Sequence, residues 1–294
     1  MHIQDMLREY FTNSKGAKQR VAEFFIANFD DIPMLTLDEV SIQVDVSMST
    51  ITRTISEMGF HGYPEFQKHV WVSIKSRLAP SKRMGLKAPK LSARALSESF
   101  QHDIESVVQA SNLNLESVFD DAAELIANAS RVYVLGVRTA STLSSYLFYG
   151  LSKVRSYVYN LDSGGTSLME HLSEMTSDCV MFTATFPRYT RYTVEAAEKM
   201  CKRGGNVISL TDGPSSPLAP YSKVALYAPY DSLSFYNSMV APLSVLNVLI
   251  IKVNSILANT GESHLIQYES LMDEWEVIVA SRKKNNDNGN RKST

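Results

Sequence analysis

Residues 178–192 of this 294-residue chain read DCVMFTATFPRYTRY. The stretch begins with an apolar run, continues through two threonines and a proline, and ends with two arginines that are each followed by a tyrosine. A buried strand that leads into hydroxyl and basic residues is typical of α/β proteins, whose ligands bind where the strands end. The stretch therefore predicts a strand followed by a loop that favours an anion.

Similar apolar runs recur at regular intervals along the C-terminal two thirds of the chain. Helix-length segments such as TASTLSSYLFYGLSKV (139–154) separate most of them. Strands that are apolar on both faces and alternate with helices predict a parallel sheet that is covered on both sides. We therefore expect a five-stranded α/β/α sandwich with strands in RVYVLG (131–136), RSYVYNL (155–161), DCVMFTAT (178–185), NVISLT (206–211) and KVALYAP (223–229).

Ligands of such sheets bind outside the carboxyl ends of the strands. This rule selects four loops: Gly136–Ser141, Asp162–Ser167, Thr183–Thr190 and Thr211–Pro217. They are rich in Gly, Ser and Thr, and backbone N–H groups at helix starts, hydroxyls and guanidinium groups all favour an anion. The candidate effector-binding residues are Gly136, Arg138, Thr139, Ser141, Thr183, Thr185, Arg188, Tyr189 and Thr190.

The two arginines of these loops, Arg138 and Arg188, are planar cationic groups that bind carboxylate or phosphate through paired hydrogen bonds. The alternative is that one or both are structural and pair with Asp162, Asp178 or Asp212. A dinucleotide is disfavoured because the sequence GVRTAS (136–141) is not the glycine-rich fingerprint G-x-G-x-x-G. We expect no cofactor and no metal.

The N-terminal third has the spacing of short helices. Apolar residues of KGAKQRVAEFFIANF (15–29) fall on one helical stripe. Thr36 and Glu39, three residues apart, predict a capping box that opens a second helix. Ser47 or Ser49 can cap a third helix that stops near Gly59, so the pattern predicts a helix-turn-helix.

The third of these predicted helices buries Ile51, Ile55 and Met58 and turns short hydroxyl side chains and one arginine outward. Hydroxyls can contact phosphates or bases, and arginine can bind guanine through two hydrogen bonds in a major groove. A small helical bundle without DNA contacts is the alternative. The candidate DNA-binding residues on and before this helix are Ser47, Ser49, Thr50, Thr52, Arg53 and Ser56.

Charge is distributed unevenly although the net charge is only −2. Residues 1–97 carry 13 Lys/Arg against 10 Asp/Glu, and residues 66–97 contain no acidic residue. This basic stretch is either a solvated linker or a surface that attracts a polyanion. We include Lys82 and Arg83 among the DNA-binding candidates; the other basic residues of the stretch are Lys68, Lys75, Arg77, Lys87, Lys90 and Arg94.

Bulk features point to a cytoplasmic protein. No run approaches the roughly 18 uncharged apolar residues that a membrane span needs, so no membrane partner is expected. Asp5 and Glu9 lie where a signal peptide has basic and apolar residues. Cys179 and Cys201 lack metal-ligand spacing and are expected to be reduced.

The run TLDEVSIQVDVSMSTITRTISEMGFHGYPEFQKHV (36–70) resembles the DNA-binding domain of the RpiR family of bacterial regulators. The most specific part is S-x-S-T-x-x-R followed by MGFHGYPEFQ (58–67), which matches the family's Leu-Gly-Phe-x-Gly-Tyr-x-Glu-Phe segment. Two residues depart from the pattern, since Ser41 replaces a small alanine and Asp45 replaces the glycine of the turn. Aspartate tolerates a left-handed backbone, so we expect the turn to survive.

Residues 130–256 resemble the sugar isomerase (SIS) domain, the sensor half of RpiR regulators, most closely in VISLTDGPSSPLAPYSKVALYAP (207–229). In the usual first loop, G-x-G-x-S, this chain has Arg138 for the second glycine and Ala140 for the serine. The usual S-x-S-G-x-T after the third strand is replaced by TATFPRYT (183–190). The resemblance implies a phosphosugar effector and a dimer. Because Arg138 and Arg188 suit carboxylate as well as phosphate, we expect a phosphosugar or a sugar acid, bound by a homo-oligomer that is a dimer or a tetramer.

Together these features predict a transcriptional regulator that binds a double-stranded operator, senses a small anionic sugar-type metabolite and is not an enzyme. One alternative is a phosphosugar isomerase or lyase with an accessory helical domain, for which Glu170 and His171 would be the acid and base. The other is a DNA-binding or scaffolding module whose SIS-like part no longer binds a ligand. The expected division of the chain is a helix-turn-helix domain (1–78), a basic linker with a connecting helix (79–114), an effector domain (115–280) and a disordered tail (281–294).

Overall fold

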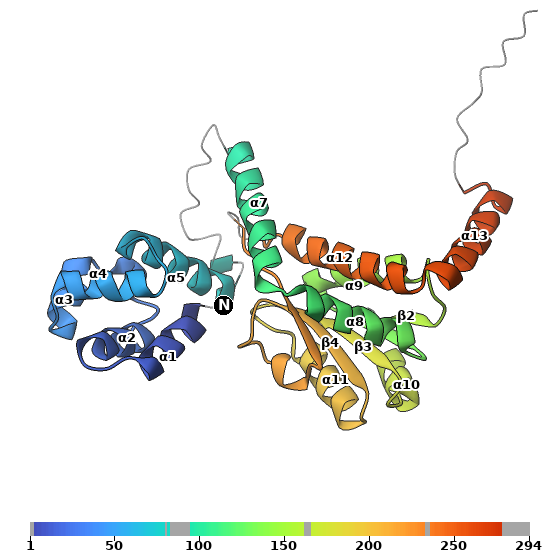
Figure 1. The fold of residues 1–294 in the computed structure, drawn as a ribbon, viewed down its shortest axis with the longest axis horizontal. Helices are drawn as coiled ribbons and strands as arrows, with labels where there is room; N and C mark the ends of the chain where they lie inside the picture. Colours follow the sequence, from blue (N-terminus) through green and yellow to red (C-terminus); the bar gives the residue numbers. More distant parts are fainter. Residues whose placement is uncertain (1–2, 80, 83–94, 162–165, 233–235, 278–294) are drawn as a thin grey trace, which may run out of the picture.

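The computed structural model describes residues 3–79, 81–82, 95–161, 166–232 and 236–277. It has an all-helical N-terminal region followed by an α/β region with one parallel sheet, which confirms the predicted fold class (Figure 1). Several positions that the sequence singled out lie outside the described residues: Arg83, Lys87, Lys90, Arg94, Asp162 and the tail 281–294.

The N-terminal region contains five α-helices among its described residues. The predicted helices correspond to α2, α3 and α4, whereas α1 and α5 were not predicted. Phe25 and Phe66 are fully buried with ring centroids 4.7 Å apart, and removing each ring from water contributes about 2–3 kcal/mol. The helices are α1 (Ile3–Asn13), α2 (Ala17–Ala27), α3 (Leu37–Val44), α4 (Met48–Glu57) and α5 (Tyr63–Arg77).

The turn between α3 and α4 forms as the local sequence predicts. The Glu39 backbone N–H donates to the Thr36 hydroxyl (3.2 Å) and the Thr36 N–H donates to the Glu39 carboxylate (2.7 Å), which completes the capping box. Asp45 adopts the left-handed conformation (φ 55°), as expected for a residue in the glycine position. The Ser41 hydroxyl donates to the Val46 carbonyl (2.6 Å), so this departure from the family pattern braces the turn.

The sheet contains five strands in the order β2-β1-β3-β4-β5, and every neighbouring pair is parallel. All five predicted strands are present. β2 is only partly buried because it is an edge strand, so the expectation of two apolar faces does not hold for it. The strands are β1 (Val132–Gly136), β2 (Val158–Asn160), β3 (Val180–Ala184), β4 (Asn206–Thr211) and β5 (Val224–Tyr227).

Helices cover both faces of the sheet and make three layers (Figure 1). Val132 and Val134 of β1 pack with α8, α9 and α12, whereas the alternate residues Tyr133 and Leu135 pack on the side of α10 and α11. This alternation follows from the two-residue period of a strand. The helices are α7 (Ala95–Leu113), α8 (Glu116–Asn128), α9 (Ser141–Leu151), α10 (Thr166–Glu174), α11 (Arg191–Lys202), α12 (Val240–Ile256) and α13 (Ala258–Glu274).

Helix α12 is the most apolar helix of the sheet region, and α13 was not predicted. Leu246 and Leu249 of α12 are fully buried in the core shared with β4 and β5. In the described part of the chain, no helix taken singly has the length and apolarity of a membrane span; α12 and α13 reach that threshold only as a pair bent by 109°.

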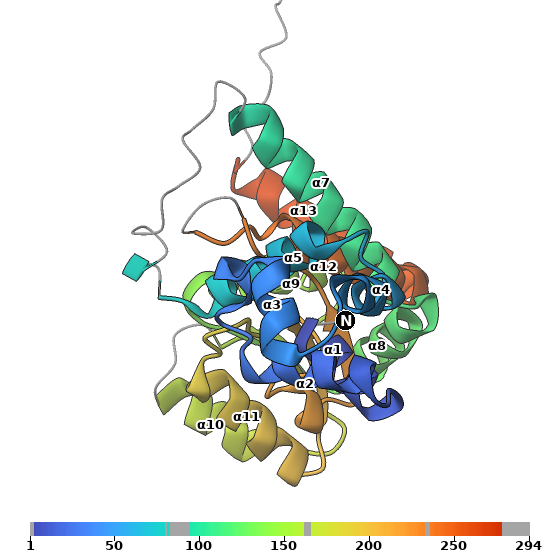
Figure 2. The same cartoon turned by 90° about the vertical axis from the view of Figure 1, so that its left-hand side faces the viewer.

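The helical region faces the edge of the sheet at which β4 and β5 end. Residues 229–231, which follow β5, and Asp212, which follows β4, line a cavity together with residues of α1, α5 and α7. Figures 1 and 2 show α7 rising beside this junction. The DNA-binding candidates and the loops that follow the strands therefore belong to two regions in direct contact.

The Thr36 capping box predicts a measurable stability effect. We expect Thr36→Ala to lower the free energy of unfolding by about 1 kcal/mol, because the Glu39 backbone N–H loses its acceptor and the Glu39 carboxylate loses the Thr36 hydroxyl. Thr12→Ala is the matched control, since its hydroxyl bonds only to the Arg8 carbonyl one turn earlier in α1 (2.9 Å). Equal denaturant midpoints for Thr36→Ala and the unaltered protein would contradict the role of this cap.

Candidate functional site

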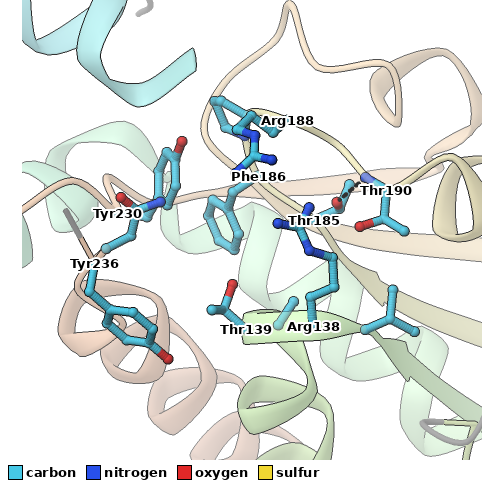
Figure 3. A pocket seen from close by; sticks show the side chains of 12 residues that line it. Arg138, Thr139, Thr185, Phe186, Arg188, Thr190, Tyr230 and Tyr236 are labelled. Carbon is cyan, nitrogen blue, oxygen red and sulfur yellow. Dashed lines mark hydrogen bonds between the residues drawn. The ribbon is translucent and has the colours of Figure 1, made fainter. Parts of the chain in front are cut away.

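A pocket of about 120 Å³ lies at the carboxyl edge of the sheet, where β1 and β3 end side by side (Figure 3). Because these strands are neighbours, the loops that follow them meet at this edge. A third wall comes from the chain that follows β5. The pocket is lined by Val137, Arg138, Thr139, Ala140, Thr185, Phe186, Pro187, Arg188, Thr190, Tyr230, Tyr236 and Asn237.

Arg138 and Arg188 enter the pocket from the two different loops, and both guanidinium groups point into the space between them (Figure 3). Both residues have left-handed backbones, with φ values of 59° and 69°. This conformation costs a residue with a Cβ roughly 1–2 kcal/mol, and glycine avoids the cost. Such strain concentrates at ligand sites, so the two arginines are the strongest candidates for contacts with an anion.

The proposed structural partners of these arginines are engaged elsewhere or lie outside the described residues. The Tyr189 hydroxyl donates to Asp212 (2.9 Å), and the Thr176 hydroxyl donates to Asp178. None of the ion pairs formed between described residues includes Arg138 or Arg188. Both side chains are exposed, so their charges face the solvent-accessible mouth of the pocket.

Hydroxyl and amide groups line the pocket beside the arginines. The buried Thr185 hydroxyl accepts a hydrogen bond from the Thr190 N–H (3.1 Å), which fixes the loop between them. Thr190 is the residue before α11, and its side chain makes no capping hydrogen bond. The positive end of the α11 dipole therefore adds to the two guanidinium charges at this edge.

The opposite wall is aromatic. Phe186 and Tyr230 are nearly buried and stack with ring centroids 4.8 Å apart and an interplanar angle of 28°. Tyr236 is more than half exposed and lies beside them (Figure 3). A pocket with charge on one side and flat apolar rings on the other suits a small amphipathic anion.

The pocket is smaller than the roughly 300–1,000 Å³ that encloses a drug-sized ligand. Its volume of about 120 Å³ suits a single anionic group with a few neighbouring atoms. The remainder of a larger ligand would extend through the open side.

The DNA-binding candidates lie on the outer face of α4 and on the turn before it. Ser49, Arg53 and Ser56 are exposed, and Thr50 and Thr52 are partly exposed. Ser47 caps α4, because its hydroxyl accepts the Thr50 N–H (3.3 Å). Ile51, Ile55 and Met58 are buried on the inner face, as the helical spacing predicts. Lys82 is exposed after α5.

Two protein-family models match this chain. The model of the helix-turn-helix domain of the rpiR family matches residues 1–77, and the SIS domain model matches residues 125–252. The chain belongs to the RpiR family. It is therefore a transcriptional regulator that joins a helix-turn-helix domain to a SIS domain.

Similar proteins show the same arrangement. An uncharacterised HTH-type transcriptional regulator of Providencia stuartii is 22% identical over 82% of this chain and 85% of its own length. The sugar isomerase domain of an RpiR transcription factor from Sphaerobacter thermophilus is 25% identical, with a TM-score of 0.58 over 60% of this chain and 99% of that one. The Vibrio vulnificus NanR protein, complexed with ManNAc-6P, has the same fold at 19% identity, with a TM-score of 0.57 over 92% of this chain and 98% of its own.

Four of the effector-binding candidates of this RpiR protein do not line the pocket. A Cβ on Gly136 would lie 2.3 Å from the Ala140 carbonyl oxygen, so this glycine permits a close backbone approach. The Ser141 hydroxyl donates to the Arg138 carbonyl (2.7 Å) and braces the loop. Thr183 is buried within β3, and Tyr189 bonds to Asp212. The five that do line it are Arg138, Thr139, Thr185, Arg188 and Thr190.

The candidate acid and base of the alternative enzymatic reading lie away from the pocket. The His171 ring packs against Tyr133 and Tyr159, with centroid distances of 5.6 and 5.2 Å. Glu170 is exposed on α10. Neither residue belongs to the pocket lining. The relatives that match this chain are named as transcriptional regulators.

The aromatic wall of the regulator was missed by the sequence analysis. Tyr230, Tyr236 and Asn237 follow β5, and the rule that ligands bind at the carboxyl ends of strands applies to this strand as well. The sequence APYDSLSFYNS (228–238) contains the signal, since it places three aromatic residues after an apolar run. What the sequence could not show is that this segment reaches across β4 and β3 to the end of β1.

The left-handed backbones predict an unusual order of variant stabilities. At Arg138 and Arg188 we expect the glycine variant to be more stable than the alanine variant by about 1 kcal/mol, because only alanine keeps the Cβ clash. Lys199, exposed within α11, is the matched control, where alanine should exceed glycine by about 1 kcal/mol. Urea unfolding of the six variants measures both differences. The same order at all three sites would show that the arginine backbones are not strained in solution.

Proposed function

We propose that this regulator binds a small anionic sugar derivative, a phosphosugar or a sugar acid, between Arg138 and Arg188, and that binding changes its affinity for operator DNA. The observation that carries the proposal is the convergence of two left-handed arginines on one pocket at the carboxyl edge of the sheet. A planar guanidinium can hold a phosphate or carboxylate through two parallel hydrogen bonds.

The remaining lining supports a sugar-derived ligand. The hydroxyls of Thr139 and Thr190 can exchange hydrogen bonds with a polyhydroxylated chain or ring. The stacked pair Phe186–Tyr230 offers a flat apolar surface for its C–H groups. The complex of the NanR protein with ManNAc-6P supports a phosphosugar, because NanR has the same fold over most of this chain.

The arginines keep a sugar acid open as the second member of this class. The resemblance to SIS domains leads one to expect hydroxyls and glycine in these loops, and guanidinium groups bind carboxylates as well as phosphates. A ligand with both an acidic group and hydroxyls satisfies each side of the pocket.

In the DNA-bound state, α4 is the element that enters the major groove, with Ser49, Thr50, Thr52, Arg53 and Ser56 facing the DNA. Ser47 fixes the start of this helix and Lys82 and Arg83 contact the backbone phosphates. Two copies on a near-palindromic operator would place their α4 helices about 34 Å apart. Effector binding that alters this spacing would change operator affinity by about 5–150-fold, the usual range of coupling between sites.

Assembly of two or four copies is supported by apolar side chains on the outer face of the sheet domain. Tyr149 of α9 and Ile251 of α12 are 59% and 66% exposed on neighbouring helices. Exposed apolar groups gathered in this way favour association. The division into residues 1–78, 79–114, 115–280 and 281–294, and a cytoplasmic location where DNA is accessible, complete the proposal.

The effector proposal is tested by ligand binding to the purified full-length protein. A thermal-shift screen of sugar phosphates and sugar acids should find compounds that raise the melting temperature, because they bind only the folded state. For such a compound we expect Arg188→Ala to weaken the affinity at least tenfold in isothermal titration, the loss of about one charged hydrogen bond. Arg191→Ala is the matched control, since Arg191 pairs with Glu195 outside the pocket (2.6 Å). Unchanged affinity of Arg188→Ala would remove this residue from the site.

The DNA proposal makes a separate prediction. Arg53→Ala should weaken binding to the operator by about 1–3 kcal/mol and relax the preference for one base pair, if the side chain contacts a base. Lys82→Ala should instead lower the affinity for all duplexes and reduce the slope of log affinity against log salt by about one. Fluorescence anisotropy across a salt series measures both. An Arg53→Ala protein with full affinity and unaltered base preference would show that Arg53 is not a reader.

A further inference from the structure

Tyr230 belongs to two cavities at once. Its side chain lines the pocket of Arg138 and Arg188, and its ring stacks there on Phe186. It also lines, with Pro229 and Asp231, a second cavity of about 600 Å³ at the junction of the two regions. Tyr230 is therefore shared by the effector pocket and the junction cavity, and the stretch 229–232 that holds it runs along the domain junction.

The other walls of the junction cavity come from the helix-turn-helix domain and from α7. Met58, Phe60 and Lys68 contribute from the end of α4 and from α5, and His102 and Glu105 contribute from α7. A movement of residues 229–232 would therefore directly change their contacts with the DNA-binding domain.

Two polar contacts fasten the shared wall across the junction. The Lys75 ammonium at the end of α5 donates to the Ser232 backbone carbonyl (2.8 Å). The His102 imidazole of α7 lies 3.4 Å from the Asp231 carboxylate. Because Lys75 contacts the backbone, this contact depends on where residue 232 lies rather than on which side chain it carries.

Helix α5 is rigidly joined to the rest of the helix-turn-helix domain. Phe66 is fully buried and packs edge-on against Phe60 at 5.5 Å, directly after α4. The Tyr63 hydroxyl and the Gln67 amide both donate to the Leu35 carbonyl (2.9 and 2.7 Å) just before α3. A displacement of the Lys75 end of α5 is therefore carried to the elements that hold α4.

We propose that Lys75 and residues 229–232 form the connection through which the effector pocket changes the position of the DNA-binding domain. A ligand in the pocket shifts the stack of Tyr230 on Phe186 and with it residues 229–232. The hydrogen bond from Lys75 to Ser232 then transfers this movement to α5. Lys75 is a positioning residue in this scheme, since it contacts neither the effector pocket nor the proposed DNA face. The regulatory role of this connection rests on the proposed function, but the physical coupling between residues 229–232 and α5 does not.

Hydrogen–deuterium exchange of the full-length protein tests the connection without effector or DNA. Tyr230→Leu removes the ring stack while keeping an apolar side chain. We expect it to speed exchange about fivefold in peptides from residues 229–232 and also in those from α5, the population change that corresponds to one net hydrogen bond. In a Lys75→Met background the same substitution should speed exchange in residues 229–232 only. Lys75→Arg, which keeps a cationic donor, should restore the effect on α5.

Lys68→Met is the matched control, because Lys68 lies on the same helix as Lys75 and lines the junction cavity. It should leave the effect of Tyr230→Leu on α5 intact. Phe186→Leu perturbs the stack from the other side and replaces Tyr230→Leu if that variant does not fold. An effect on α5 that persists unchanged with Lys75→Met, or no effect on α5 in the unaltered background, would overturn the proposal. Neither reading depends on the effector or the operator, so failure of the proposed function would leave this experiment unaffected.

Discussion

The close approach between the end of β1 and the turn that follows it determines the shape of the effector pocket. The Ala140 carbonyl oxygen lies 2.3 Å from the position that a Cβ on residue 136 would take, so the chain can turn back in this way after β1 only because Gly136 has no side chain. The Ser144 hydroxyl donates to the Gly136 carbonyl (3.3 Å) and holds the turn on the first residues of α9. With the chain folded back in this way, Arg138 and Thr139 stand beside the loop from β3 instead of extending past it. The glycine thus shapes the pocket without lining it.

Arg138 and Arg188 reach the pocket from two different loops, and both have a positive backbone φ angle. Each has a positive φ, which the described chain also shows at Gly59 and Gly204 and at the non-glycine residues Asp45, Tyr157 and Glu276. A residue with a Cβ loses roughly 1–2 kcal/mol of stability in this backbone conformation. The packing of the sheet around the two loops must offset this loss. As a result, one guanidinium group stands on each side of the small pocket. For the proposed anionic ligand, a loop backbone that is already in place would reduce the entropy lost on binding.

The strand order brings the pocket of Arg138 and Arg188 close to the helix-turn-helix domain. β5 lies at the edge of the sheet, and the chain that leaves it passes the pocket on one side and the helix-turn-helix domain on the other. Tyr230 contacts the ligand pocket, and two residues later the Ser232 carbonyl accepts the bond from Lys75. A few adjacent residues and one helix therefore span the space between the pocket and the helix-turn-helix domain.

The sequence by itself determined the features that depend on neighbouring residues. Thr36 with Glu39 marked the start of α3, Asp45 fitted the left-handed turn, the outer face of α4 followed from helical spacing, and five apolar runs gave the strands, because capping and periodicity act within a few residues. It also placed Arg138 and Arg188 at the correct edge of the sheet. Only the tertiary structure decided which loops meet, that Tyr189 turns to Asp212 while Thr190 faces the pocket, and that Tyr230 closes it. Those outcomes depend on which strands are neighbours and on the paths of loops far apart in the chain, and no local pattern encodes them.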